Sequence, residues 1–119
     1  METINGCIVV APGEGPGYLR FDPPELDGAY VVELLAVPAG DPAPPLHLHP
    51  NTDEAFYVAE GEATFRLGDR ELQVAPGGFV FVPRGVAHTV WNSGDSLARG
   101  LLIISPGDAE HEFVPVEAA

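Results

Sequence analysis

The chain has 119 residues, which corresponds to a single domain able to bury a hydrophobic core without disulfides. Although it contains 14 glycines and 13 prolines, 45% of its residues are hydrophobic, which argues against a disordered chain. Its net charge is −13, and all five cationic residues are arginines. Because binding to phosphates requires a basic surface, we expect neither nucleic acid nor an anionic membrane as a partner.

The start of the chain and its cysteine content indicate the compartment. Cys7 is the only cysteine, so no internal disulfide forms and no oxidising environment is implied. No charge-led signal peptide opens the sequence, and no apolar run approaches the roughly 20 residues of a membrane helix. We therefore expect a soluble cytoplasmic protein with one domain over residues 1–119.

Short apolar runs, rich in β-branched and aromatic residues and separated by Gly, Pro and Asp, predict strands throughout. In chain order the predicted strands are Ile4–Val10, Tyr18–Phe21, Tyr30–Val37, Pro45–His49, Glu54–Ala59, Ala63–Leu67, Arg70–Val74, Gly78–Val82, His88–Asn92 and Arg99–Ser105. Ala11–Gly17 reads as a linker or flexible loop, and Pro106–Ala119 as an acidic tail that forms a short strand or an arm. So many short strands predict an all-β sandwich, jelly roll or small barrel.

Three of the four histidines fall inside two compact patterns. These are Gly40-x6-His47-x-His49-x4-Glu54-x6-Gly61 and Gly77-x5-Pro83-x-Gly85-x2-His88-x3-Asn92. From the composition, the His-x-His-x4-Glu part is expected about 0.01 times in such a chain, and Pro-x-Gly-x2-His-x3-Asn about 0.001 times. Their joint presence therefore indicates a specific site.

The spacing of the first pattern suits metal binding. Side chains alternate between the two faces of a strand, so His47 and His49 point the same way. A carboxylate from Glu54 and a third imidazole from His88 could converge with them on one ion. Four protein ligands on a six-coordinate ion leave two positions for water, dioxygen or a substrate.

The two patterns resemble the two motifs of the cupin superfamily, particularly its small, single-domain members similar to quercetin dioxygenase. The motifs span residues 40–92, and the flanking strand pattern extends the resemblance over nearly the whole chain. It implies a double-stranded β-helix, or jelly-roll barrel, with metal ligands at His47, His49, Glu54 and His88. One departure is that six residues, where the family usually has five, separate Gly40 from His47.

The resemblance leaves several functions open. The first is a metal-dependent, dioxygenase-like oxidoreductase that acts on a small neutral or aromatic molecule, with Glu54 also a possible proton acceptor. The second is a non-redox isomerase, cyclase or lyase, and the third a non-catalytic ligand-binding module with a structural metal. The cofactor would be a divalent transition metal: Fe, Mn, Ni, Co, Cu or Zn. The resemblance also implies a homodimer that exchanges or packs N-terminal strands.

Several of these residues also have plainer interpretations. His47, His49 and Glu54 could form a polar strand face in water, and His88 could be a hydrogen-bonded core histidine. Asn92 is more typical of a residue that bonds a turn. His111, in the tail, is expected to be solvated. Phe56, Phe65, Phe79, Phe81 and Val90 are expected to line the core or a cavity.

Overall fold

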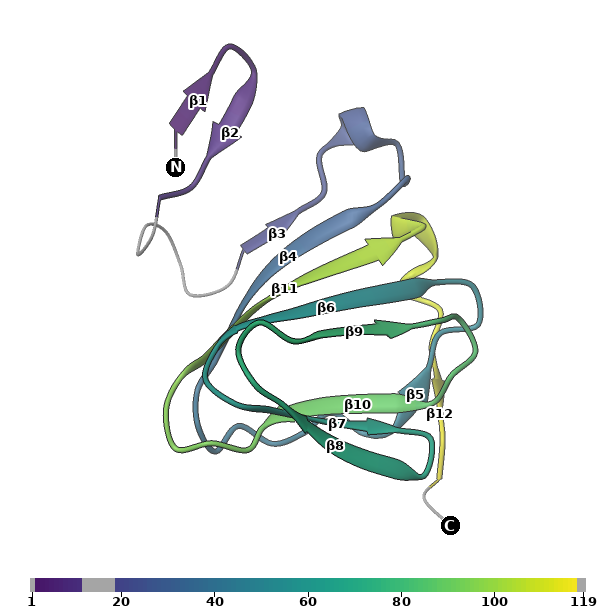
Figure 1. Cartoon of the computed structure of the whole chain (residues 1–119). Helices are drawn as coiled ribbons and strands as arrows, with labels where there is room; N and C mark the ends of the chain where they lie inside the picture. The colour runs from purple at the N-terminus through teal and green to yellow at the C-terminus, as the bar shows by residue number, and fades with distance from the viewer. Residues whose placement is uncertain (1, 12–18, 118–119) are drawn as a thin grey trace.

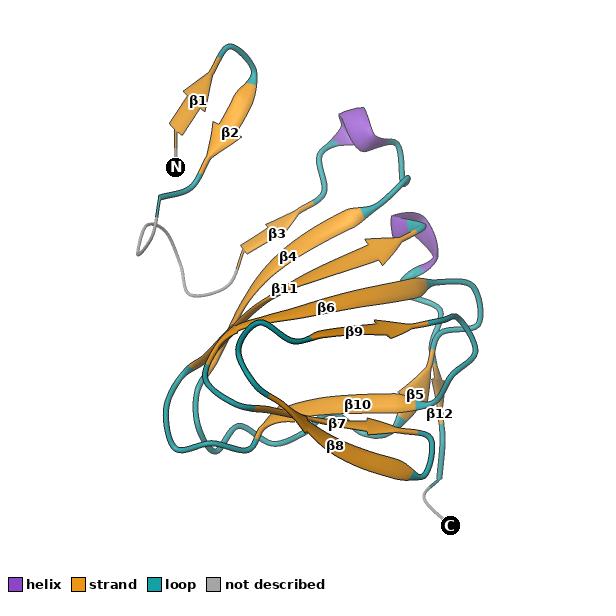
Figure 2. Cartoon of the chain, in the orientation of Figure 1, coloured by secondary structure: helices purple, strands orange, loops and turns teal. Residues whose placement is uncertain are grey.

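Short β-strands make up most of the computed structural model, which describes residues 2–11 and 19–117 (Figures 1 and 2). The strands are β1 (Glu2–Ile4), β2 (Cys7–Val9), β3 (Leu19–Phe21), β4 (Val31–Val37), β5 (His47–Leu48), β6 (Asp53–Glu60), β7 (Ala63–Leu67), β8 (Arg70–Val74), β9 (Phe79–Val82), β10 (His88–Asn92), β11 (Ala98–Ser105) and β12 (Val114–Pro115). Single 3-10 turns follow β3 and β11: η1 (Pro24–Leu26) and η2 (Gly107–Ala109). No helix in the described part of the chain is long and apolar enough to cross a membrane.

Two five-stranded sheets face each other across the core (Figure 2). One has the order β12-β5-β10-β7-β8 and the other the order β3-β4-β11-β6-β9, with antiparallel pairing throughout. Each sheet includes neighbours that are distant in sequence, as when β4 pairs with β11 and β10 pairs with β5. This arrangement is a jelly-roll barrel and confirms the predicted fold class.

The core lies between the inner faces of the two sheets. Strand β6 shows why, since its alternate residues Glu54, Phe56 and Val58 are buried while Tyr57 between them is exposed. Phe56 packs edge-on against Phe65 of the opposite sheet, with ring centroids 5.3 Å apart. The remaining buried apolar residues of this cluster are Val31, Ala63, Val80, Val82, Leu102 and Ile104.

One predicted strand is wrong. The run Ile4–Val10 forms a hairpin of β1 and β2, because Asn5 and Gly6 adopt positive φ angles of 50° and 80°. Asn-Gly favours such a two-residue turn, so the signal was present in the sequence. Tyr18, and the predicted linker Ala11–Gly17 beyond its first residue, lie outside the described residues.

The outer face of the second sheet is apolar as well. Phe79 and Phe81 of β9, predicted to line the core, are instead 64% and 54% exposed, because Val80 and Val82 occupy the inward positions of that strand. The register places them at the ends of two rows that cross the sheet. The rows are Phe79, Tyr57, Leu101, Leu34, Leu19 and Phe81, Ala55, Ile103, Val32, Phe21.

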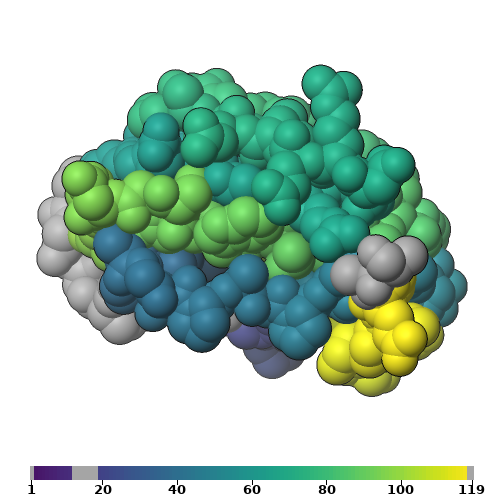
Figure 3. Space-filling view, turned by 90° about the horizontal axis from the view of Figure 1, so that it is seen from below, coloured from purple at the N-terminus to yellow at the C-terminus, as the bar shows by residue number. Residues whose placement is uncertain are grey.

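The C-terminal segment returns to the barrel. Strand β12 pairs with β5, placing Pro115 opposite His47, and the predicted tail thus contains a short strand. In the space-filling view this yellow segment packs beside the blue segment that leads into β5 (Figure 3).

Phe65→Ala is expected to lower the free energy of unfolding by about 3–5 kcal/mol, because Phe65 is only 1% exposed and its removal leaves a cavity. Urea unfolding followed by circular dichroism measures this loss. Phe113→Ala is the matched control: with 58% of Phe113 exposed, the change should stay within about 0.5 kcal/mol. Equal losses in the two variants would contradict this assignment of the core.

Candidate metal centre

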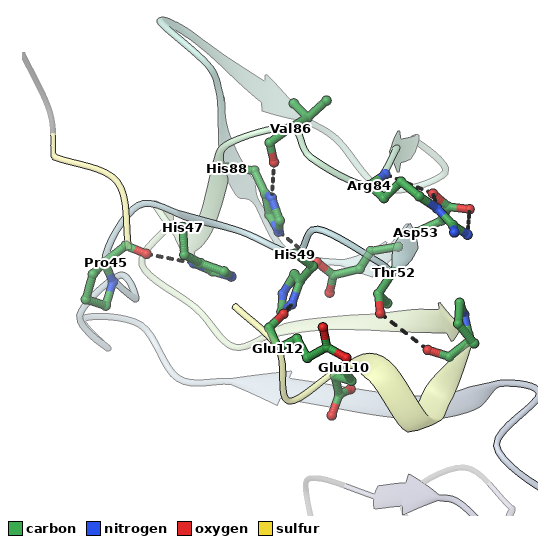
Figure 4. Close-up of polar contacts among 12 residues, drawn as sticks. Pro45, His47, His49, Thr52, Asp53, Arg84, Val86, His88, Glu110 and Glu112 are labelled. Carbon is green, nitrogen blue, oxygen red and sulfur yellow. Dashed lines mark hydrogen bonds and ion pairs between the residues drawn. The ribbon is translucent and has the colours of Figure 1, made fainter. Parts of the chain in front are cut away.

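The four residues predicted as metal ligands come together at one end of the barrel (Figure 4). His47 lies in β5, His49 directly follows that strand, and His88 begins β10, where it pairs with His47. Glu54 arrives from β6 in the opposite sheet. One potential ligand atom from each residue lies within 4.8 Å of the others, so the group is able to hold one metal ion.

The carboxylate of Glu54 is the centre of this group. Its Oε1 lies 2.7 Å from His88 Nε2 and 3.3 Å from His49 Nε2. Glu54 is 6% exposed and His88 3%, so these contacts are made away from bulk water. A buried carboxylate requires such partners, because its desolvation is otherwise very costly.

All three imidazoles are oriented by the backbone. In each ring Nδ1 faces a carbonyl oxygen, which must accept a hydrogen bond from it, and Nε2 is then the nitrogen available to a metal. The acceptors are Pro45 O for His47 (2.8 Å), Glu112 O for His49 (3.2 Å) and Val86 O for His88 (2.9 Å). Backbone acceptors of this kind are the usual second layer of a histidine metal site.

The pKa values of His47 and His88 shift in opposite directions. Burial lowers the pKa of His47 below its usual value, and the nearby His88 and His49 rings add to the effect. Burial also acts to lower the pKa of His88, but the hydrogen bonds to Glu54 and Val86 outweigh it, so that pKa is raised. In the metal-free protein the contact between His88 Nε2 and Glu54 therefore favours the protonated form of this ring.

The loop of the second motif joins the two halves of the site. The Gly85 amide donates to His49 O at 2.8 Å, and Thr89 Oγ1 donates to Pro44 O at 2.7 Å. Gly85 has a φ of 83°, a conformation that favours glycine at this turn. These bonds hold the two motifs in fixed register.

Some contributors to the site come from the tail and were not predicted. Besides the carbonyl of Glu112, its carboxylate accepts a bond from Asn51 Nδ2 at 2.7 Å. Two residues earlier, Glu110 Oε1 accepts a bond of 2.7 Å from Arg20 Nη1. A backbone carbonyl can belong to any residue type, so the sequence does not indicate that Glu112 contacts His49. The sequence predicts only that the tail contains a short strand or an arm.

Two other polar residues of the motifs and tail lie apart from the ligand group. Asn92 Nδ2 donates to Val37 O and Ser96 O, both at 2.8 Å, and its side-chain oxygen accepts from Gly94, so it closes a turn. His111 is exposed and does not belong to the group of four.

The fold and the site together define this protein as a jelly-roll barrel whose three imidazoles and one carboxylate are able to hold a metal ion. The sequence also matches the family described as Cupin domain over residues 33–105, and the chain belongs to this family. The family match includes both motifs and all four clustered residues.

Individual relatives share about a third of their residues with this chain over the matched regions. The chain is 34% identical over 80 residues to the tetracenomycin polyketide synthase protein TcmJ of Streptomyces glaucescens, covering 61% of this chain and 54% of TcmJ. It is 35% identical over 98 residues to quercetin 2,3-dioxygenase of Bacillus subtilis, covering 74% of this chain but 29% of that enzyme. The structure of the DMSP lyase DddQ of Ruegeria pomeroyi superimposes with a TM-score of 0.61 at 29% identity, covering 75% of this chain and 44% of DddQ. The chain thus spans about half the length of TcmJ and less of the other two.

Zinc affinity is expected to fall at least about tenfold between pH 8 and pH 5, because protons compete for the imidazole nitrogens that bind the metal. Because the pKa of His88 is raised, protons compete with the metal for this ring at higher pH than for an ordinary histidine. Because the pKa of His47 is lowered, protons compete for that ring only at lower pH. Isothermal titration with Zn²⁺ at the two pH values measures the change.

Two variants make that titration specific. His88→Ala should lower the affinity at pH 8 by more than the roughly 100-fold cost of losing an outer hydrogen-bond partner. His111→Ala should leave both the affinity and its pH dependence unchanged. Equal affinity at pH 5 and pH 8 would argue against these ligands.

Proposed function

We propose that the protein is a metal-dependent enzyme of the dioxygenase type that acts on a small neutral or aromatic molecule. The observation that carries the proposal is the group of three imidazoles and the Glu54 carboxylate, within 4.8 Å of one another, of which His49, Glu54 and His88 are buried. The similarity to quercetin 2,3-dioxygenase supports the reaction type.

The chain's own residues have distinct roles in this proposal. His47, His49 and His88 would hold the metal through Nε2, and Glu54 would complete the set. A bound divalent ion such as iron or manganese supplies dioxygen activation and polarisation of a substrate oxygen. A carboxylate that binds a metal through one oxygen keeps the other available, so Glu54 is also the candidate proton acceptor.

A second candidate is non-redox catalysis by the same residues, as in an isomerase, cyclase or lyase. The likeness to the DMSP lyase DddQ favours this alternative, and the same ligands serve a metal that only polarises a carbonyl group. A third candidate, a non-catalytic ligand-binding module with a structural metal, uses the same geometry without a reaction.

Oxygen consumption separates these candidates. The protein loaded with iron or manganese should consume oxygen with at least one member of a panel of phenols, diketones and thiols, and the Zn²⁺-loaded protein and the His88→Ala variant should not. Product analysis by mass spectrometry follows each reaction. Full turnover with Zn²⁺ would favour the non-redox candidate, and absence of turnover with every metal the binding module.

We also propose that a second copy of this chain is the partner. The outer face of the second sheet has two apolar rows, and Tyr57, Phe79 and Phe81 on it are 44%, 64% and 54% exposed. The hairpin of β1 and β2 projects from the barrel, with Ile4 and Ile8 nearly half exposed (Figure 1). An isolated two-stranded hairpin is only marginally stable, and a large exposed apolar face is typical of an interface. A second copy that packs against the hairpin and the outer face of the sheet would explain why both are apolar.

Phe81→Glu is expected to convert the dimer into a monomer, because it places a charge in the apolar row while leaving the inward side of β9 intact. Size-exclusion chromatography with light scattering at micromolar concentration measures the mass. Arg70→Glu, on the edge strand β8 of the other sheet, is the control and should remain dimeric. A monomeric unmodified protein would refute the proposed dimer.

A further inference from the structure

An apolar vestibule adjoins the metal centre. Its cavity has a volume of about 330 Å³ and is lined by Pro44, Pro45, His47, His49, Phe113 and Pro115. His47 is the least buried of the four clustered residues, and it belongs to this lining. The vestibule is therefore the side from which a small molecule reaches the ligand group.

The barrel interior offers much less room. The core is filled by Phe56, Phe65 and their neighbours, and the cavity they border has a volume of about 70 Å³. Sites for small molecules usually have volumes of about 300–1,000 Å³. Of these two cavities, only the vestibule is large enough for an organic substrate.

Phe113 forms one wall of the vestibule, and the residues on both sides of it are hydrogen-bonded to the barrel. Its ring stands edge-on to the imidazole of His47, with centroids 6.1 Å apart. On its C-terminal side β12 pairs with β5, and the Val116 amide donates to Leu46 O at 2.9 Å. On its other side Asn51 donates to Glu112. An aromatic wall held at both ends is preorganised for binding.

The charges around the vestibule select against anions. Its lining contains no arginine, and the chain has no lysine. Arg20 does not belong to this lining, and its guanidinium is paired with Glu33 at 2.8 Å and with Glu110 at 2.7 Å. With a net charge of −13, the metal-free protein has no lysine or arginine in this lining to compensate a phosphate or carboxylate.

We propose that this vestibule is the substrate pocket and that Phe113 is a specificity-determining residue, which stacks on an uncharged aromatic ring whose oxygen points toward the four clustered residues. Proline and aromatic surfaces bind flat rings without requiring a charged partner. The inference rests on the proposed function for the reaction, but the pocket itself can be tested by binding alone.

Phenol is the probe, titrated by NMR into both the metal-free and the Zn²⁺-loaded protein. Phe113→Ala should weaken phenol binding about fivefold to tenfold, the loss expected for one aromatic contact, and Phe113→Trp should restore it. Zn²⁺ affinity should not change in either variant. Val114→Ala, at the next position and outside the vestibule lining, is the matched control and should bind phenol like the unmodified protein. Phenyl phosphate should bind the metal-free protein more weakly than phenol.

Equal phenol affinity of Phe113→Ala and the unmodified protein would overturn the inference, as would the absence of phenol binding to both forms of the unmodified protein. Failure of the proposed function has a different signature. If Zn²⁺ does not bind but phenol still binds in a Phe113-dependent manner, the metal chemistry is refuted and the aromatic pocket is supported.

Discussion

The arrangement of the candidate site depends on the burial of one carboxylate, that of Glu54. Glu54 is 6% exposed, and a carboxylate in that position is tolerated only with close hydrogen-bond or metal partners. The partners, His88 and His49, come from the opposite sheet, so the contact joins the two sheets where the apolar core ends. The same electrostatic requirement that stabilises Glu54 also creates a set of metal donors.

The C-terminal segment links this centre to the rest of the chain. Glu112 supplies the carbonyl that orients His49, and the neighbouring Phe113 walls the vestibule. Strand β12 pairs with β5, and this pairing brings the C-terminal segment beside the first motif, although His49 and Glu112 are 63 residues apart in sequence. The orientation of the His49 ring and the wall of the vestibule beside the candidate site therefore both depend on this C-terminal segment.

The sequence predicted some elements better than others. The strands Ala63–Leu67, in which apolar and polar residues alternate, and His88–Asn92 lie where they were expected. In β9 all four residues, Phe79 to Val82, are apolar, so the sequence pattern does not indicate which face of this strand turns inward. The run Ile4–Val10 is apolar apart from Asn5 and Gly6, and these two residues form the turn that divides it into a hairpin.

By itself the sequence determined the class of fold and the residue types of the candidate metal centre, because strand periodicity and ligand spacing are local properties. It placed His47 and His49 on one face and indicated Glu54 and His88 as their companions. Only the tertiary structure decided which face of each sheet is buried, which carbonyls orient the imidazoles, and that Phe113 lies beside His47. These three features depend on contacts between segments that are distant in the chain. A backbone carbonyl or a single aromatic residue that makes such a contact leaves no recognisable pattern in the sequence.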